Sequence, residues 1–155
     1  MKVKKPTFGA QEKLARYIEP EYRQGSKRAK VGAFMEVHDA TRNGLSVNSL
    51  EIHTENQIAA IYANKLDKLR PVAISISTID DYNEAARAVN VAVAIEPTTK
   101  RWVHTGPNGS EESYKHDPKL NNDSHCLVRF TRHFNESQAF RFAHRMARKP
   151  TYRLY

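Results

Sequence analysis

The stretch VAISISTIDDYNEAARAVNVAVAI, residues 72–95, decides the fold class of this chain. Its first part alternates Val and Ile with small residues, which is typical of a strand with at least one buried face. Thr78 then offers a helix cap, and apolar residues recur at helical spacing between residues 82 and 89. From residue 91 the chain alternates again, with Ala between Val and Ile, so this strand can be buried on both faces. A strand, a helix and a strand in succession predict a fold in which helices cover a sheet.

The same patterns extend outward from this stretch. Strands are predicted at residues 31–37, 45–52, 72–76, 91–95, 101–104 and 126–130. Helices are predicted from Thr54 to just before Pro71, from Thr78, and from Asn135 to just before Pro150. Because Arg42-Asn43-Gly44 has the chemistry of a tight turn, the first two strands are expected to form a hairpin. The fold class is therefore α+β or mixed α/β, with a mixed sheet of about five to six strands and three to four helices.

One domain is expected, because 155 residues suffice to bury a core without disulfides or metal. Residues 1–30 are interpreted as a basic N-terminal arm with one short helix. Leu14, Tyr17 and Ile18 would share a face of that helix, which Pro20 would end. Residues 31–155 are interpreted as a single α/β domain that closes with a basic amphipathic helix.

Charge is strongly segregated along the chain. Residues 1–30 hold nine Lys and Arg against three Glu, and residues 125–155 hold seven Lys and Arg against one Glu. Between them, residues 31–124 carry nine basic and thirteen acidic residues. Two basic ends around a mildly acidic body favour a polyanionic partner and steer its approach.

The final helix gives the sharpest functional signal. At 100° per residue, Arg141, Arg145 and Arg148 fall within about 60° of one another, opposite the apolar residues. Arginine suits bidentate contact with phosphates and also stacks on bases. The residues predicted to bind nucleic acid are Arg132, Arg141, Arg145, Arg148, Lys149, Tyr152 and Arg153.

Aromatic residues near this helix, Tyr152 and Tyr155, favour RNA or single-stranded nucleic acid as the ligand. The main hypothesis is a small basic nucleic-acid-binding protein. The plainer alternative is a solvated helix face, although an ordinary solvent face mixes charges of both signs.

A second hypothesis is an enzyme on the same polyanion, either a metal-independent nuclease or a toxin-like, nucleotide-dependent transferase. Such an enzyme needs a histidine base, a histidine acid and a cation on the phosphate. His104 and His125 with Arg129 are the candidates, provided that their strands are neighbours. A third hypothesis is an interaction subunit that binds an acidic protein partner or forms a homo-oligomer.

Several classes of protein are disfavoured by the sequence. No metal-ligand spacing and no cofactor motif is present, so neither a metal nor a cofactor is expected. Cys126 is the only cysteine, which suits a reducing compartment. No apolar segment follows the basic start and none is long enough to cross a membrane, so we expect a cytoplasmic protein without membrane contact, with secretion by a signal-independent route as the alternative.

Overall fold

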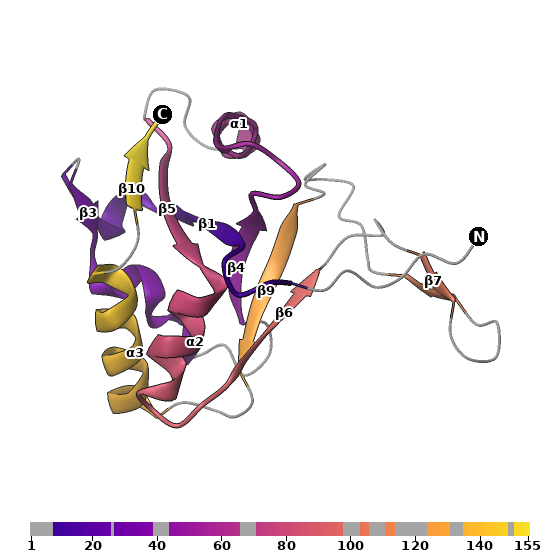
Figure 1. The fold of residues 1–155 in the computed structure, drawn as a ribbon. Helices are drawn as coiled ribbons and strands as arrows, with labels where there is room; N and C mark the ends of the chain where they lie inside the picture. The colour runs from indigo at the N-terminus through magenta and orange to yellow at the C-terminus, as the bar shows by residue number, and fades with distance from the viewer. Residues whose placement is uncertain are drawn as a thin grey trace.

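The computed structural model describes residues 8–25, 27–38, 44–65, 71–97, 103–105, 111–113, 124–130, 135–148 and 151–155. Six strands form one sheet in the order β10-β5-β1-β4-β9-β6, and each neighbouring pair in it is antiparallel (Figure 1). The strands are β1 (Lys13–Ile18), β4 (Leu45–Ser49), β5 (Ala73–Thr78), β6 (Val93–Pro97), β9 (His125–Phe130) and β10 (Thr151–Leu154). Two small two-stranded sheets pair β2 (Arg23–Gln24) with β3 (Arg28–Ala29) and β7 (Val103–Thr105) with β8 (Glu111–Ser113). The predicted α+β class is confirmed.

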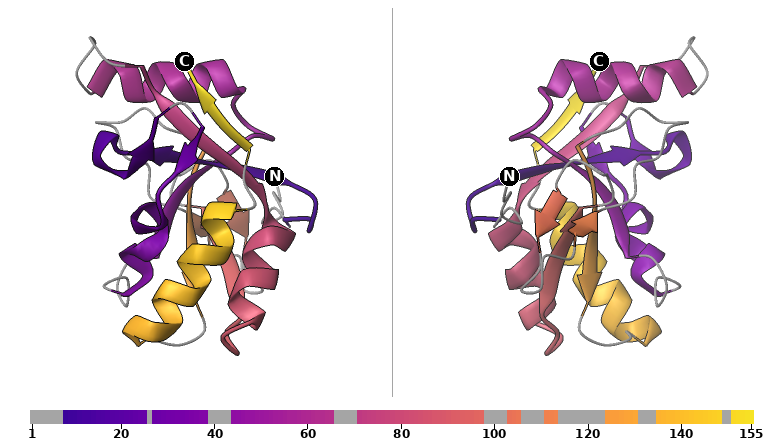
Figure 2. Two further views of the ribbon diagram at one scale, coloured as in Figure 1. Left: turned by 90° about the vertical axis from the view of Figure 1, so that its left-hand side faces the viewer. Right: turned by 90° about the vertical axis from the view of Figure 1, so that its right-hand side faces the viewer.

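Helices cover both faces of the sheet. The helices are α1 (Glu55–Lys65), α2 (Ile79–Arg87) and α3 (Glu136–Arg148), together with the short 3-10 helices η1 (Pro20–Tyr22) and η2 (Val31–His38). α2, α3 and η2 pack on one face, and α1 lies on the other (Figure 2). No helix in the described part of the chain is long and apolar enough to cross a membrane.

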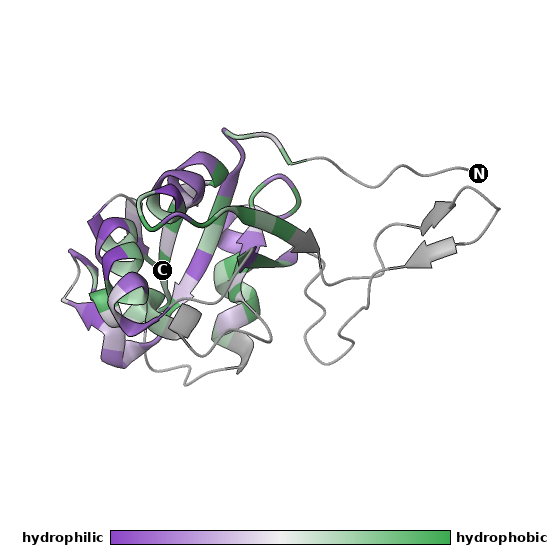
Figure 3. Ribbon diagram, turned by 90° about the horizontal axis from the view of Figure 1, so that it is seen from below, coloured by the Kyte–Doolittle hydropathy of each residue, from purple (hydrophilic) through white to green (hydrophobic). Residues whose placement is uncertain are grey.

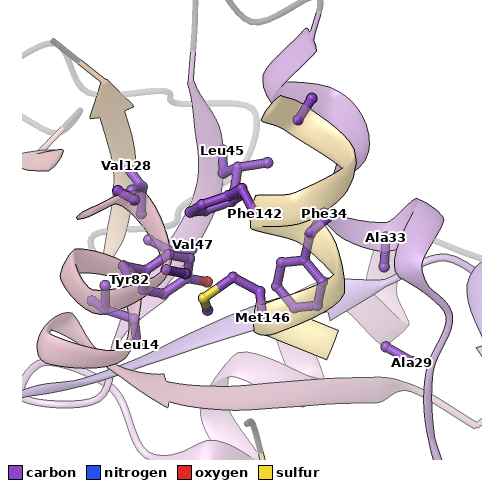
Figure 4. Packing of buried hydrophobic residues seen from close by; sticks show 14 of the residues in the cluster. Leu14, Ala29, Ala33, Phe34, Leu45, Val47, Tyr82, Val128, Phe142 and Met146 are labelled. Atoms are coloured by element: carbon purple, nitrogen blue, oxygen red, sulfur yellow. The ribbon is translucent and has the colours of Figure 1, made fainter. Parts of the chain in front are cut away.

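Successive side chains of the strands point to opposite faces of the sheet, so each face has its own hydrophobic core. Leu14 of β1 faces the larger core, while its neighbour Ala15 faces the smaller core under α1. In the larger core, Phe34 of η2 and two residues of α3, Phe142 and Met146, surround the sheet residues (Figure 4). These side chains are fully buried, so α3 is held firmly against the sheet by its apolar side.

The stretch 72–95 folds as predicted. It forms β5, α2 and β6, and it carries the chain past β1, β4 and β9 to the far edge of the sheet. The Thr78 side chain accepts from the Asp81 backbone N–H, and the Asp81 carboxylate accepts from that of Thr78. This capping box satisfies two amides of the first turn, so the helix starts where the sequence predicts.

The predicted short helix around Leu14, Tyr17 and Ile18 is wrong, because these residues form β1 near the centre of the sheet. The charged residue Arg16 explains why the sequence does not indicate a buried strand here. Its side chain is buried, and its guanidinium donates to the carbonyls of Ala33 and Ser46, both at 2.9 Å. A buried arginine is compatible with a core strand when its N–H groups bond to backbone oxygens. From its residue type alone, however, an arginine is expected to be exposed.

The predicted strand at residues 31–37 is also wrong, and with it the hairpin to residues 45–52. Residues 31–38 form η2, and the neighbours of β4 are β1 and β9. Ala33 and Phe34 are consecutive and both buried in the same core, which a strand with alternating faces would not allow. Conversely, residues 151–154, for which no strand is predicted, form the edge strand β10 against β5.

The phenol of Tyr82 gives the fold a testable pH dependence. Burial raises the pKa of Tyr82 to about 12, whereas an unfolded tyrosine titrates near pH 10. Because folding raises this pKa, Tyr82 contributes stability that is fully present below about pH 10 and is lost as the pH rises towards 12. We expect this loss to reach about 2 kcal/mol in the free energy of unfolding, and Tyr82→Phe to lack it. Urea denaturation of both proteins between about pH 8 and 12 measures the difference; parallel profiles would contradict it.

Candidate nucleic-acid interface

A groove between the β2–β3 hairpin and α3 brings the two basic ends of the chain together. It encloses about 640 Å³ of space, its open mouth included. Cations from both ends line it: Arg28 and Lys30 come from the hairpin and its exit, and Arg148 comes from the last turn of α3. His144 lies one turn earlier on the same helix and also faces the groove. The lining that the structure describes contains no acidic side chain.

The sequence of α3 explains how one wall of this groove is oriented. Four apolar residues of α3 are buried, and its arginines are exposed: the buried residues are Ala139, Phe142, Ala143 and Met146, and the exposed arginines are Arg141, Arg145 and Arg148. Asn135 fixes the start of the helix through two hydrogen bonds. Its Oδ1 accepts from the Gln138 backbone N–H at 2.8 Å, and the Gln138 Oε1 accepts from the Asn135 backbone N–H at 3.0 Å. Helices with both hydrophilic and hydrophobic residues are visible in Figure 3. Burial of the apolar side therefore directs the arginines outward.

The hairpin that forms the other wall is tied down at several points. Gly25 adopts a φ of 58° in the turn between β2 and β3, and its carbonyl accepts from the Tyr152 hydroxyl at 3.4 Å. Arg23 donates to the carbonyls of Ile18 and Pro71 at 3.0 and 2.7 Å. The Lys30 backbone N–H donates to the Tyr22 carbonyl at 2.7 Å. These bonds keep the cations of the hairpin beside α3.

The predicted binding residues are only partly brought together. Arg148 lines the groove, and Arg145 is exposed on the same helix. Arg141 reaches across to α2, where its Nη2 donates to the Ala88 carbonyl at 3.2 Å. Arg132 and Lys149 lie outside the described residues.

Tyr152 and Arg153 are separated by the strand that they form. Tyr152 packs against the larger core and bonds the hairpin, whereas the Arg153 Nε lies 3.3 Å from the Glu55 Oε1 of α1. Successive residues of a strand point to opposite faces, so Arg153 does not belong to the groove. Tyr155 also bonds Glu55, with its hydroxyl at 2.6 Å.

Sequence reasoning missed Arg28, Lys30 and His144, which with Arg148 are the basic residues and the histidine of the groove. The arm at residues 1–30 is basic as a whole, but nothing in the sequence singles out Arg28 and Lys30 within it. His144 is one of seven histidines without a distinguishing context. Only the charge of the two ends hinted that these segments share a partner.

The strand order does not place the predicted catalytic residues on neighbouring strands. β7, which contains His104, pairs with β8, while the neighbours of β9 are β4 and β6. The strand adjacency on which the prediction depended is therefore not found. His125 and Arg129 lie on β9 and are half-buried, and the side chain of His104 lies outside the described residues. Their catalytic role stays a prediction.

A serine and a histidine do meet elsewhere, at the end of β4. The Ser124 Oγ lies 2.8 Å from the His53 Nδ1 and accepts from the Asn48 Nδ2 at 2.9 Å. Asn48 in turn accepts from the Tyr62 hydroxyl at 2.8 Å. Ser124 is fully buried, so a substrate could not reach it. The network joins β4, β9 and α1, and we assign it a structural role.

Neither a metal site nor a similarity to known proteins helps to interpret the groove. Among the described residues, no group of three His, Cys, Asp or Glu is placed to hold a metal ion. Comparisons of the chain with protein-family models, with curated proteins and with solved structures give no match. The site must therefore be interpreted from its own geometry and charge.

Proposed function

We propose that this protein binds nucleic acid through the groove between the β2–β3 hairpin and α3. The observation that carries the proposal is that cations from opposite ends of the chain, Arg28, Lys30 and Arg148, line one groove. Arginine forks and a lysine ammonium are the side chains that contact phosphates most readily. The exposed Arg141 and Arg145 extend this basic surface along α3.

A second hollow on the same molecule shows what an ordinary solvated surface looks like. It encloses about 490 Å³, its open mouth included, and lies between β1, β5 and α1. Its lining mixes both signs: the charged residues are Lys13, Glu55, Asp81 and Arg153. The cations of the groove lack such partners among its described lining, so their mutual repulsion would be relieved by a polyanion.

Salt dependence tests the proposal on the unmodified protein. Three to five phosphate contacts predict that log Kobs falls against log salt with a slope of about −2 to −3.5 for single strands, at roughly 0.7 per contact. Fluorescence anisotropy with labelled RNA, single-stranded DNA and duplex DNA at several salt concentrations measures it. Absence of binding to every probe at low salt would contradict the proposal. An acidic protein would then be the partner to seek for the groove.

A further inference from the structure

Phe140 stands out on the helix that forms one wall of the groove. Among the residues that the structure describes, Phe140 is 53% exposed, more than the other exposed large apolar residues, Leu154 at 39% and Tyr155 at 38%. The ring lies beside that of His144, with the centroids 6.0 Å apart and the planes 35° from parallel. His144 itself lines the groove. The exposed ring is thus one helical turn from the basic surface.

The spacing along α3 suits several nucleotides. Phe140 and Arg148 are eight residues apart, which corresponds to about 12 Å along a helix axis. At about 3.4 Å per stacked nucleotide, that distance spans three to four nucleotides of one strand. One base can therefore lie on the Phe140 ring while phosphates further along the strand reach Arg148 and the hairpin cations.

We infer that the ligand of this groove is single-stranded nucleic acid and that Phe140 stacks on one of its unpaired bases. This inference rests on the proposed function and adds a choice between strand types. In a duplex the faces of internal bases are covered by their neighbours, so only a single strand offers a base to Phe140.

The choice of Phe140 replaces the aromatic residues that the sequence singled out. The Tyr152 hydroxyl bonds the carbonyl of Gly25, and its ring packs against the larger core. The Tyr155 hydroxyl bonds Glu55 of α1. Phe140 has no side-chain polar atom to satisfy, and the residue is more than half exposed, so a base can reach it.

Substitution of Phe140 tests the inference on the full chain. The probes are a labelled uridine oligonucleotide within the range of about 4–16 nucleotides that single-strand-binding folds cover, and an RNA duplex of the same length. We expect Phe140→Ala to weaken binding of the oligonucleotide at least about fivefold, because base–aromatic stacking contributes on that scale, and to leave duplex binding within about twofold. Leu154→Ala, an exposed apolar residue that does not line the groove, is the matched control and should change neither.

A direct signal of stacking comes from Phe140→Trp. Its indole fluorescence should be quenched by the uridine oligonucleotide and much less by the duplex, relative to the wild type, in which Trp102 is the only tryptophan. Equal effects of Phe140→Ala on both probes, or none on the single strand, would overturn the inference. If the wild type binds neither probe, the proposed function itself fails. If it binds both equally and Phe140→Ala has no effect, only the strand choice fails.

Discussion

Reversal of two groove charges, Lys30→Glu with Arg148→Glu, is expected to weaken nucleic-acid binding at least about 100-fold at low salt. Each substitution would remove a proposed phosphate contact and place a charge of the same sign as the phosphates in its position, at about 1 kcal/mol per charge pair even in water. The salt slope should become shallower by about 1.4, since two contacts at roughly 0.7 each are lost. Both side chains are exposed, so the fold should survive, which circular dichroism checks. Anisotropy titrations at several salt concentrations give both quantities.

The control must change net charge equally without touching the groove. Lys13→Glu with Arg87→Glu does so: Lys13 lies in the hollow of mixed charge, and Arg87 is exposed in the last turn of α2. We expect this variant to lose less than about threefold, through the general field alone. If it loses as much as the groove variant, overall charge and not the groove carries binding.

The elements that could be predicted from sequence are those whose signals are local. The stretch 72–95 contains both its periodicity and its cap, so β5 and α2 follow from neighbouring residues alone. The start of α3 is likewise encoded by Asn135 and Gln138, which bond each other three residues apart. Such signals need no information about the rest of the chain.

The errors arise where distant segments decide the local structure. Arg16 occupies β1 because the carbonyls of Ala33 and Ser46 receive its donors, 17 and 30 residues away. Leu14 and Ile18 are four apart, a spacing that fits one face of a helix as well as one face of a strand. The sequence around them therefore cannot distinguish the two, and tertiary contacts settle the matter.

For the candidate site, too, the features encoded locally could be predicted and those that depend on distant segments could not. The outward face of α3 could be predicted, because a helix with one apolar side must turn its arginines to solvent. The contribution of Arg28 and Lys30 could not, since it depends on β1 leading the chain to a hairpin beside α3. Nor could the separation of Tyr152 from Arg153, which requires that residues 151–154 form a strand.

Two glycines with similar positive φ angles should respond very differently to alanine. Gly25 has a φ of 58° and Gly44 a φ of 70°, and in this left-handed region any Cβ costs about 1 kcal/mol. A Cβ on Gly25 would meet nothing within 4 Å. A Cβ on Gly44 would lie 2.3 Å from the carbonyl oxygen of Val128, which is backbone and cannot rotate away.

We therefore expect Gly25→Ala to lower the free energy of unfolding by about 1 kcal/mol, and Gly44→Ala to lower it by about 3 kcal/mol or more. The excess arises because Gly44 precedes β4 at the point where Leu45 pairs with Val128, so the added methyl must displace one central strand from another. Chemical denaturation of the two variants measures the difference. Since both substitutions restrict the unfolded chain alike and adopt the same disfavoured φ, equal losses would mean that β4 and β9 do not approach as closely as described.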